Sequence, residues 1–221
     1  MKKLYKITSL ILIVGIMVFV FPNTAEAAIA FDAAATGAGD DSSTCSVSIT
    51  VGAGGTNRVL VAGVSAQDAT LANRNVSTVK TGTTDFTQAI EIDNPNDHAE
   101  IWYLLNPATG AHTVTFTMGG TAAGTRCGAI SLTGVSQAAP EATQTGTGTG
   151  TTQSLSITTI ADNAWIVDTV AIAGTGATTM TAATGRTERW NGLDGFDEAP
   201  RGAASTQGAI SPAGATTMAW T

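Results

Sequence analysis

The sequence predicts an all-β protein, folded as a two-sheet antiparallel sandwich behind an N-terminal signal peptide. The chain contains 25 Gly and only 12% charged residues, a composition typical of short strands and tight turns. Apolar residues either alternate with polar ones or form short runs rich in Val and Ile, and no window keeps a helical period. Three segments also occur twice in the same order, which predicts two related halves.

The first 27 residues have the features of a secretory signal peptide. Three lysines within the first six residues precede an uncharged apolar run over 10–21, and Ala25-Glu26-Ala27 forms a small-x-small cleavage site. The run is short compared with the roughly 20 residues of a membrane span, although an uncleaved anchor is the alternative. We therefore expect residues 28–221 to be secreted, either extracellular or at the cell surface, and free of the membrane.

Strands are expected along the whole mature chain. Val47, Ile49 and Val51 alternate with Ser and Thr, the pattern of a strand with one wet face. The runs at 58–64 and 164–173 are almost continuously apolar, so we expect central strands covered on both faces. Further strands are predicted at 84–92, 99–105, 111–118, 126–135, 185–190, 202–210 and 214–221.

The repeated segments define the two halves. TCSVSIT from Thr44 returns as TQSLSIT from Thr152, and NRVLVAGV from Asn57 returns as NAWIVDTV from Asn163. PATGAHTVTFT, at 107–117, returns as PAGATTMAWT at the C-terminus. We expect halves at about 44–118 and 152–221, joined by a connector at 119–151, within one domain of residues 28–221. In the favoured arrangement both halves contribute strands to both sheets, and two tandem small sandwiches are the alternative.

The mature chain has two cysteines, Cys45 and Cys127. Export places them in an oxidising compartment, so we expect a disulfide, which would stabilise the fold by roughly 4–5 kcal/mol in the chain-entropy model. Two buried free thiols are the alternative.

Several of these segments carry a resemblance. The succession NRVLVAGV, AEIWYLLNPATGAHTVTFT, GAISLTGVSQAAP, AWIVDTV and SPAGATTMAWT resembles a group of secreted bacterial β-sandwich domains of the concanavalin-like or jelly-roll kind. The resemblance implies a fold more than an activity, because sandwiches host many unrelated functions.

One strand is similar to the Glu-x-Asp-x-x-Glu strand of concanavalin-like β-glucan hydrolases. In EIDNPN, the strand period places Glu91 and Asp93 on one face, but Asn96 stands where the acid/base Glu should be. Retaining hydrolysis needs both carboxyl groups, so a glycoside hydrolase-like enzyme is only the minor alternative.

Two acidic loops occupy equivalent places in the two halves, DNPNDHAE from Asp93 and NGLDGFDEAPRG from Asn191. Clustered carboxylate and amide oxygens are the ligands that calcium prefers, whereas solvated acidic loops are the alternative. The candidate calcium ligands are Asp93, Asp97, Asp194, Asp197 and Glu198.

Trp190 adjoins the second acidic loop. Its ring could stack on a sugar while Asn191, Asp194 or Asp197 bonds the hydroxyl groups; alternatively, Trp190 closes one end of the sandwich.

Asp168 lies in the apolar run at 164–173 and shares a face with Ile and Val. A carboxylate on an inner face needs a partner, and Arg126, Arg186 and Arg189 are the candidates.

The net charge limits the classes of partner that the protein can bind. Without residues 1–27 the formal charge is −9, from seven basic and sixteen acidic side chains. This balance argues against nucleic acid or an anionic membrane as partner. The sequence therefore predicts a non-catalytic binding or adhesion module for carbohydrate, an extracellular glycan or surface polymer, with calcium as the one suggested cofactor. The alternative is a structural subunit of a surface layer or filament that self-associates.

Overall fold

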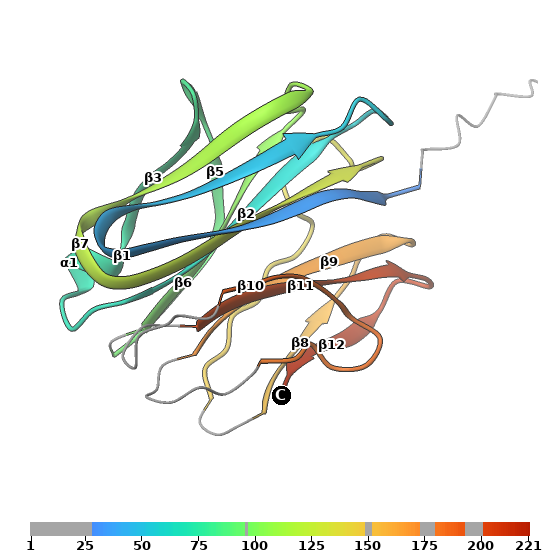
Figure 1. The fold of residues 1–221 in the computed structure, drawn as a ribbon. Helices are drawn as coiled ribbons and strands as arrows, with labels where there is room; N and C mark the ends of the chain where they lie inside the picture. Colours follow the sequence, from blue (N-terminus) through green and yellow to red (C-terminus); the bar gives the residue numbers. More distant parts are fainter. Residues whose placement is uncertain (1–27, 96, 149–151, 173–179, 193–200) are drawn as a thin grey trace, which may run out of the picture.

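The computed structural model describes residues 28–95, 97–148, 152–172, 180–192 and 201–221 (Figure 1). These residues are almost entirely β-structure in antiparallel sheets, as predicted. The elements are β1 Ala30–Val51, β2 Val59–Gln67, α1 Leu71–Arg74, β3 Val76–Thr81, β4 Thr84–Asp85, β5 Thr87–Asn94, β6 Asp97–Leu105, β7 Gly110–Thr133, β8 Gln153–Thr158, β9 Ala164–Ile172, β10 Thr187–Gly192, β11 Arg201–Ile210 and β12 Ala215–Trp220.

Strands β1 and β7 are long, and together they turn from one layer of the molecule into the next (Figure 1). Residues 44–51 of β1 pair with 110–117 of β7, whereas residues 30–40 pair with 124–133. The register shifts between Ser42 and Thr44, where the strands bend. One continuous sheet therefore folds over on itself and forms both layers of the first half.

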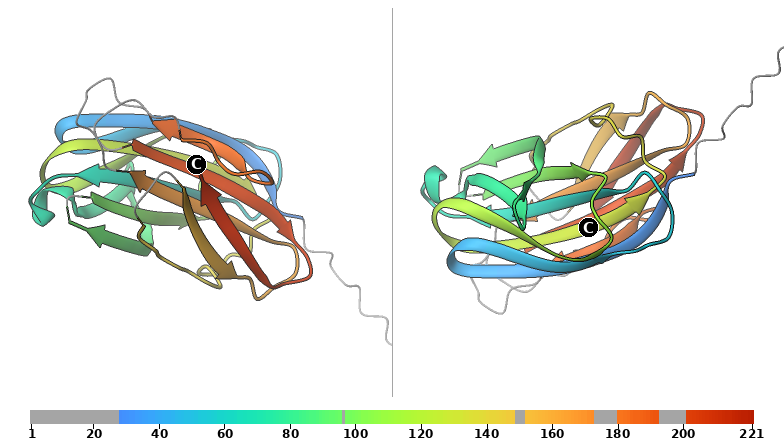
Figure 2. Two further views of the ribbon diagram at one scale, coloured as in Figure 1. Left: turned by 90° about the horizontal axis from the view of Figure 1, so that it is seen from below. Right: turned by 90° about the horizontal axis from the view of Figure 1, so that it is seen from above.

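The molecule consists of four stacked layers (Figures 1 and 2). Layer 1 contains β4, β3 and the paired segments of β7 and β1 at 110–117 and 44–51. Layer 2 contains β5, β6, β2 and the other ends of β7 and β1. Layer 3 has the order β10-β11-β9, and layer 4 is the ribbon of β8 and β12.

Three apolar cores separate the four layers. Leu60, Ala62 and Val64 of β2 face the core between layers 1 and 2, while Val59 and Val61 face the core between layers 2 and 3. Strand β2 is therefore covered on both faces, as its continuous apolar run predicted. The third core, between layers 3 and 4, contains Met180, Ala203 and Trp220.

The arrangement of the halves differs from the favoured expectation. Among the described residues, no sheet joins strands of the two halves. The sheet of the first half also includes residues 30–40 and the predicted connector as far as Thr133, so this half is longer than expected. Each half instead forms its own pair of layers, and layers 2 and 3 pack face to face, as in the tandem alternative. The physical reason is that β2 and β9 form their hydrogen bonds with strands of their own half. The apolar faces that remain on layers 2 and 3 are then buried against each other.

The two halves nevertheless pair their strands in the same way. Val47 lies opposite Val114 in the first half, and Leu155 lies opposite Met218 at the corresponding place in the second. The order β5-β6-β2 matches β10-β11-β9. Asn57 and Asn163, equivalent in the repeat, both have a positive φ, of 53° and 62°. These equivalences agree with the order of the repeated segments, and the duplication stays a prediction.

Some elements were not predicted. The first part of β1, strand β3 and the single turn of α1 were not predicted, and β7 was predicted as two strands. The disulfide between Cys45 and Cys127 was predicted and is present, with a Cα–Cα distance of 6.3 Å. It joins β1 in layer 1 to β7 in layer 2.

Candidate functional site

Polar side chains replace the apolar core at one edge of the first half, where β5 and β6 lie near α1 and β3. The group, called the edge cluster, consists of Arg74, Gln88, Glu91, Asp93, His98, Glu100 and Trp102.

The pairing of β5 with β6 brings most of the edge cluster together. Glu91 lies opposite Glu100, and Asp93 lies opposite His98. Residues directly opposite one another in an antiparallel pair project from the same face of the sheet. The two carboxylates of β5 therefore share a face, and the imidazole of β6 lies beside them.

Glu100 is the most enclosed member of the edge cluster, with 1% of its surface exposed. Its Oε1 accepts hydrogen bonds from the backbone N–H of Val76, at 2.9 Å, and from Nε2 of His98, at 2.6 Å. Its Oε2 accepts from Nε1 of Trp102, at 2.6 Å, and from Nε2 of Gln88, at 3.1 Å. A buried carboxylate needs such partners, and the bond to Val76 also ties layer 1 to layer 2.

His98 and Asp93 continue the edge cluster toward solvent. Nδ1 of His98 lies 3.4 Å from Oδ1 of Asp93, and Arg74 donates to both oxygens of Asp93, at 2.8 and 3.1 Å. Burial lowers the pKa of His98, but the hydrogen bonds and charges of Glu100 and Asp93 outweigh it, so the pKa lies above its ordinary value. The hydrogen bond from Arg74 holds the pKa of Asp93 below its ordinary value.

The structure bears on the candidate calcium ligands only in part. Both oxygens of Asp93 are already bonded to Arg74, so calcium would have to displace a guanidinium there. Burial raises the pKa of Asp97, and its Oδ1 has no hydrogen-bond partner. Asp194, Asp197 and Glu198 lie outside the described residues. The calcium site therefore stays a prediction.

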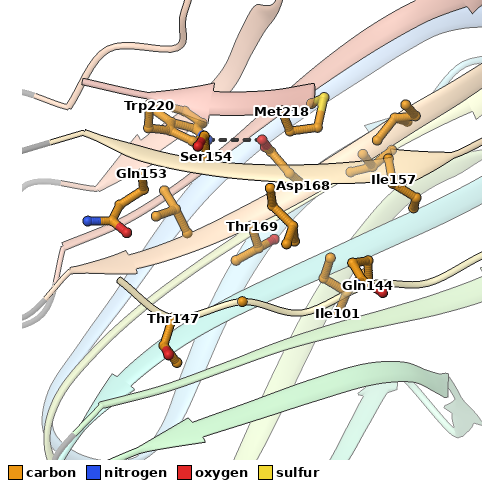
Figure 3. A pocket seen from close by; sticks show the side chains of 15 residues that line it. Ile101, Gln144, Thr147, Gln153, Ser154, Ile157, Asp168, Thr169, Met218 and Trp220 are labelled. Carbon is orange, nitrogen blue, oxygen red and sulfur yellow. Dashed lines mark hydrogen bonds between the residues drawn. The ribbon is translucent and has the colours of Figure 1, made fainter. Parts of the chain in front are cut away.

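A pocket of about 140 Å³ lies in the second half, bounded by β8, β9, β12 and the connector (Figure 3). We call it the β9 pocket. Its polar lining includes Gln144, Thr147, Gln153, Ser154 and Asp168. Thr169 also lines it, and the apolar walls come from side chains of β6, β8, β9 and β12.

Asp168 has hydrogen-bond partners other than those expected. Its Oδ1 accepts from the backbone N–H and the hydroxyl of Ser205, at 2.7 and 2.8 Å, and its Oδ2 accepts from Nε1 of Trp220, at 2.9 Å (Figure 3). No arginine bonds it directly among the described residues; Arg186 contributes only its charge. Burial raises the pKa of Asp168, although the bonds from Ser205 oppose the shift.

Trp190 is part of the core, not of a binding surface. It is 3% exposed and lies flat against Gly128, where an added Cβ would come within 2.3 Å of the indole ring. An indole enclosed in this way has no free face for a sugar, and it packs in the core between layers 2 and 3 rather than closing one end of the sandwich. Asn191 donates to the carbonyl of Met180 and to Glu188, and the other two proposed sugar ligands lie outside the described residues.

The pairing of His98 with Glu100 was not predicted, although the sequence contains a signal for it. In HAEIW, the strand period alone places His98, Glu100 and Trp102 on one face. The β9 pocket had no comparable signal, because the connector that borders it lies far from β9 in the sequence.

Comparison with known proteins identifies no relative of this chain. No protein-family model, no curated protein and no solved structure matches the chain. The resemblance to secreted bacterial sandwich domains thus remains a prediction.

In the part of the chain that the structure describes, no helix is long and apolar enough to cross a membrane.

Proposed function

We propose that this protein is an exported, non-catalytic binding module that takes one sugar residue of an extracellular glycan into the β9 pocket. The observation that carries the proposal is the carboxylate of Asp168, which is held by three hydrogen bonds at the wall of this pocket.

The lining of the β9 pocket suits a polyhydroxylated ligand. The amide of Gln144 and the hydroxyls of Thr147 and Ser154 offer donors and acceptors, while the apolar walls can pack against the C–H groups of a ring. Pockets for drug-sized ligands hold roughly 300–1,000 Å³. A volume of about 140 Å³ therefore favours a single terminal residue over a longer chain.

The same lining argues for binding without hydrolysis. Asp168 is the only carboxyl group among the described residues that line the pocket, and no His or Cys lines it with them. Glycoside hydrolysis generally needs two carboxyl groups on either side of the bond. In the edge cluster, Glu91 and Glu100 do lie near each other, but Glu100 is enclosed and fully hydrogen-bonded.

Export is supported by two features. The first 27 residues have the order of a signal peptide. The disulfide between Cys45 and Cys127 suits an oxidising compartment.

A structural subunit is the second candidate, because the outer faces of layers 1 and 4 resemble each other. Ser46 lies opposite Thr115 on one face and Ser156 opposite Thr217 on the other, with hydroxyl oxygens 3.1 Å apart in both pairs. Two hydroxyl-rich faces on opposite sides of a molecule could stack copies head to tail.

A glycan array with the purified protein tests the binding proposal. Gln144→Ala removes an exposed amide from the pocket and should weaken binding to the best glycan about five- to tenfold, since a hydrogen bond contributes up to about 1.5 kcal/mol. Gln137→Ala, on the same connector but outside the pocket, is the matched control. Absence of any bound glycan, together with mass that grows with concentration in light scattering, would favour the structural subunit.

A further inference from the structure

We propose that Glu91, His98 and Glu100 form a binding site for a divalent transition-metal ion, with zinc as the preferred ion. The site lies in the edge cluster of the first half and is independent of the β9 pocket.

The geometry brings one ligand atom of each residue within 4.8 Å of the other two. Ligand atoms around a four-coordinate zinc ion lie roughly 3.3 Å apart, given metal–ligand distances of about 2.0–2.2 Å. Nε2 of His98 and Oε1 of Glu100 are closer than this, at 2.6 Å, because they share a proton. Binding therefore needs only a small widening of this pair and an inward rotation of Glu91.

The charges in the edge cluster favour an added cation. Glu91 and Glu100 lie directly opposite each other across β5 and β6, a placement that is destabilising for like charges. A single amide, Nε2 of Gln88, donates to both carboxylates. Arg74 is already committed to Asp93, so it does not neutralise this pair.

The environment of His98 is that of a metal-binding imidazole. Its Nδ1 faces Asp93, which Arg74 in turn holds in place, while its Nε2 faces Glu100. A histidine that ligates a metal through one nitrogen usually directs the other to a carboxylate or carbonyl group, which orients the ring. Asp93 supplies that carboxylate from outside the proposed ligand set.

The mixture of ligands indicates which ion would bind. An imidazole nitrogen with two carboxylates suits zinc and related ions, whereas calcium takes six to eight oxygen ligands. On binding, the ion replaces the proton between His98 and Glu100, and that proton passes to solvent. Glu91 and Gln88 are exposed, so the ion can reach the site when the amide of Gln88 swings away.

Titration calorimetry of the purified protein with zinc chloride provides the first test. One ion should bind per chain, and Glu91→Gln should weaken the affinity at least tenfold. This exposed substitution keeps an acceptor for Gln88 and removes the repulsion between Glu91 and Glu100, so thermal stability without metal should not fall. Glu188→Gln, the same change at an exposed site of β10, is the matched control and should bind zinc like the unmodified protein.

The chain has only two histidines, so ring-nitrogen NMR gives a second test. Zinc should shift the ring signals of His98 and leave those of His112 in place. Lack of saturable binding below about 1 mM zinc, equal affinity of Glu91→Gln, or a shift at His112 would each overturn the proposal. Tighter binding of calcium chloride than of zinc chloride would overturn the choice of ion.

Discussion

At the scale of single residues, each half holds a carboxylate against a tryptophan, with Glu100 fully buried and Asp168 partly buried. Glu100 accepts from the indole of Trp102 in the first half, and Asp168 accepts from the indole of Trp220 in the second. An acid inside a β-sandwich is tolerated only when hydrogen bonds replace water, and both acids obtain them from their own half. Asp168 therefore does not need the arginine partner that was expected for it.

The burial of Asp168 predicts a pH dependence of stability. Its pKa is raised in the folded protein, so the folded state binds the proton more tightly than the unfolded state, whose pKa is about 3.9. Stability contributed by this group should therefore fall as pH rises from about 4 through the folded-state pKa.

Urea unfolding of the protein and of Asp168→Asn at a series of pH values measures this effect. The stability advantage of the original residue over Asn should shrink as pH rises, whatever its absolute size. An advantage that stays constant or grows with pH would contradict the raised pKa.

At the scale of elements, the bend shared by β1 and β7 builds the first half. Because both strands cross from layer 1 to layer 2 together, their hydrogen bonds continue through most of the turn. The disulfide links layer 1 to layer 2 inside the core between them, and Cys45 and Cys127 are both fully buried. It constrains the unfolded chain over a sequence separation of 82 residues.

Removal of this disulfide should lower the free energy of unfolding. We expect a loss of about 2–5 kcal/mol in a Cys45→Ala/Cys127→Ala variant, because the unfolded chain regains the freedom that the loop denied it. Urea unfolding without reductant measures the loss. Dithiothreitol serves as the control, since it should destabilise the original protein and leave the variant unaffected; equal effects on both would argue against the bridge.

At the scale of the whole molecule, the halves adhere through layers 2 and 3. Trp190 of β10 lies in this interface against three glycines, Gly63 of β2, Gly128 of β7 and Gly202 of β11. The missing side chains leave room for the indole, so the two halves can approach closely. Face-to-face packing at this contact, and not a shared sheet, holds the two halves together.

Filling this interface should destabilise the molecule. In Gly128→Ala the new Cβ would come within 2.3 Å of Trp190, and overpacking of this kind costs about 1–3 kcal/mol or more. Thermal unfolding measures the effect, with Gly54→Ala as the control, because no atom lies within 4 Å of a Cβ at Gly54. A Gly128→Ala variant as stable as the control would show that the halves do not pack through this contact.

The edge cluster illustrates how far a candidate site can be predicted. Strand alternation alone places Glu91 with Asp93, and His98 with Glu100 and Trp102. It cannot give the register between β5 and β6, which puts Glu91 opposite Glu100. Nor does it bring Arg74 to Asp93, since α1 and β5 meet only after the chain has folded.

The sequence by itself predicted the strand content, the disulfide and the central position of β2. Alternation and continuous apolar runs are local properties of the chain, and two cysteines in an exported chain allow only one pairing. Only the tertiary structure decided that the halves form separate layers, that Trp190 is buried between them and that the β9 pocket exists. These features depend on which faces of distant strands pack together, and a repeat shows that two units are alike without showing how they meet.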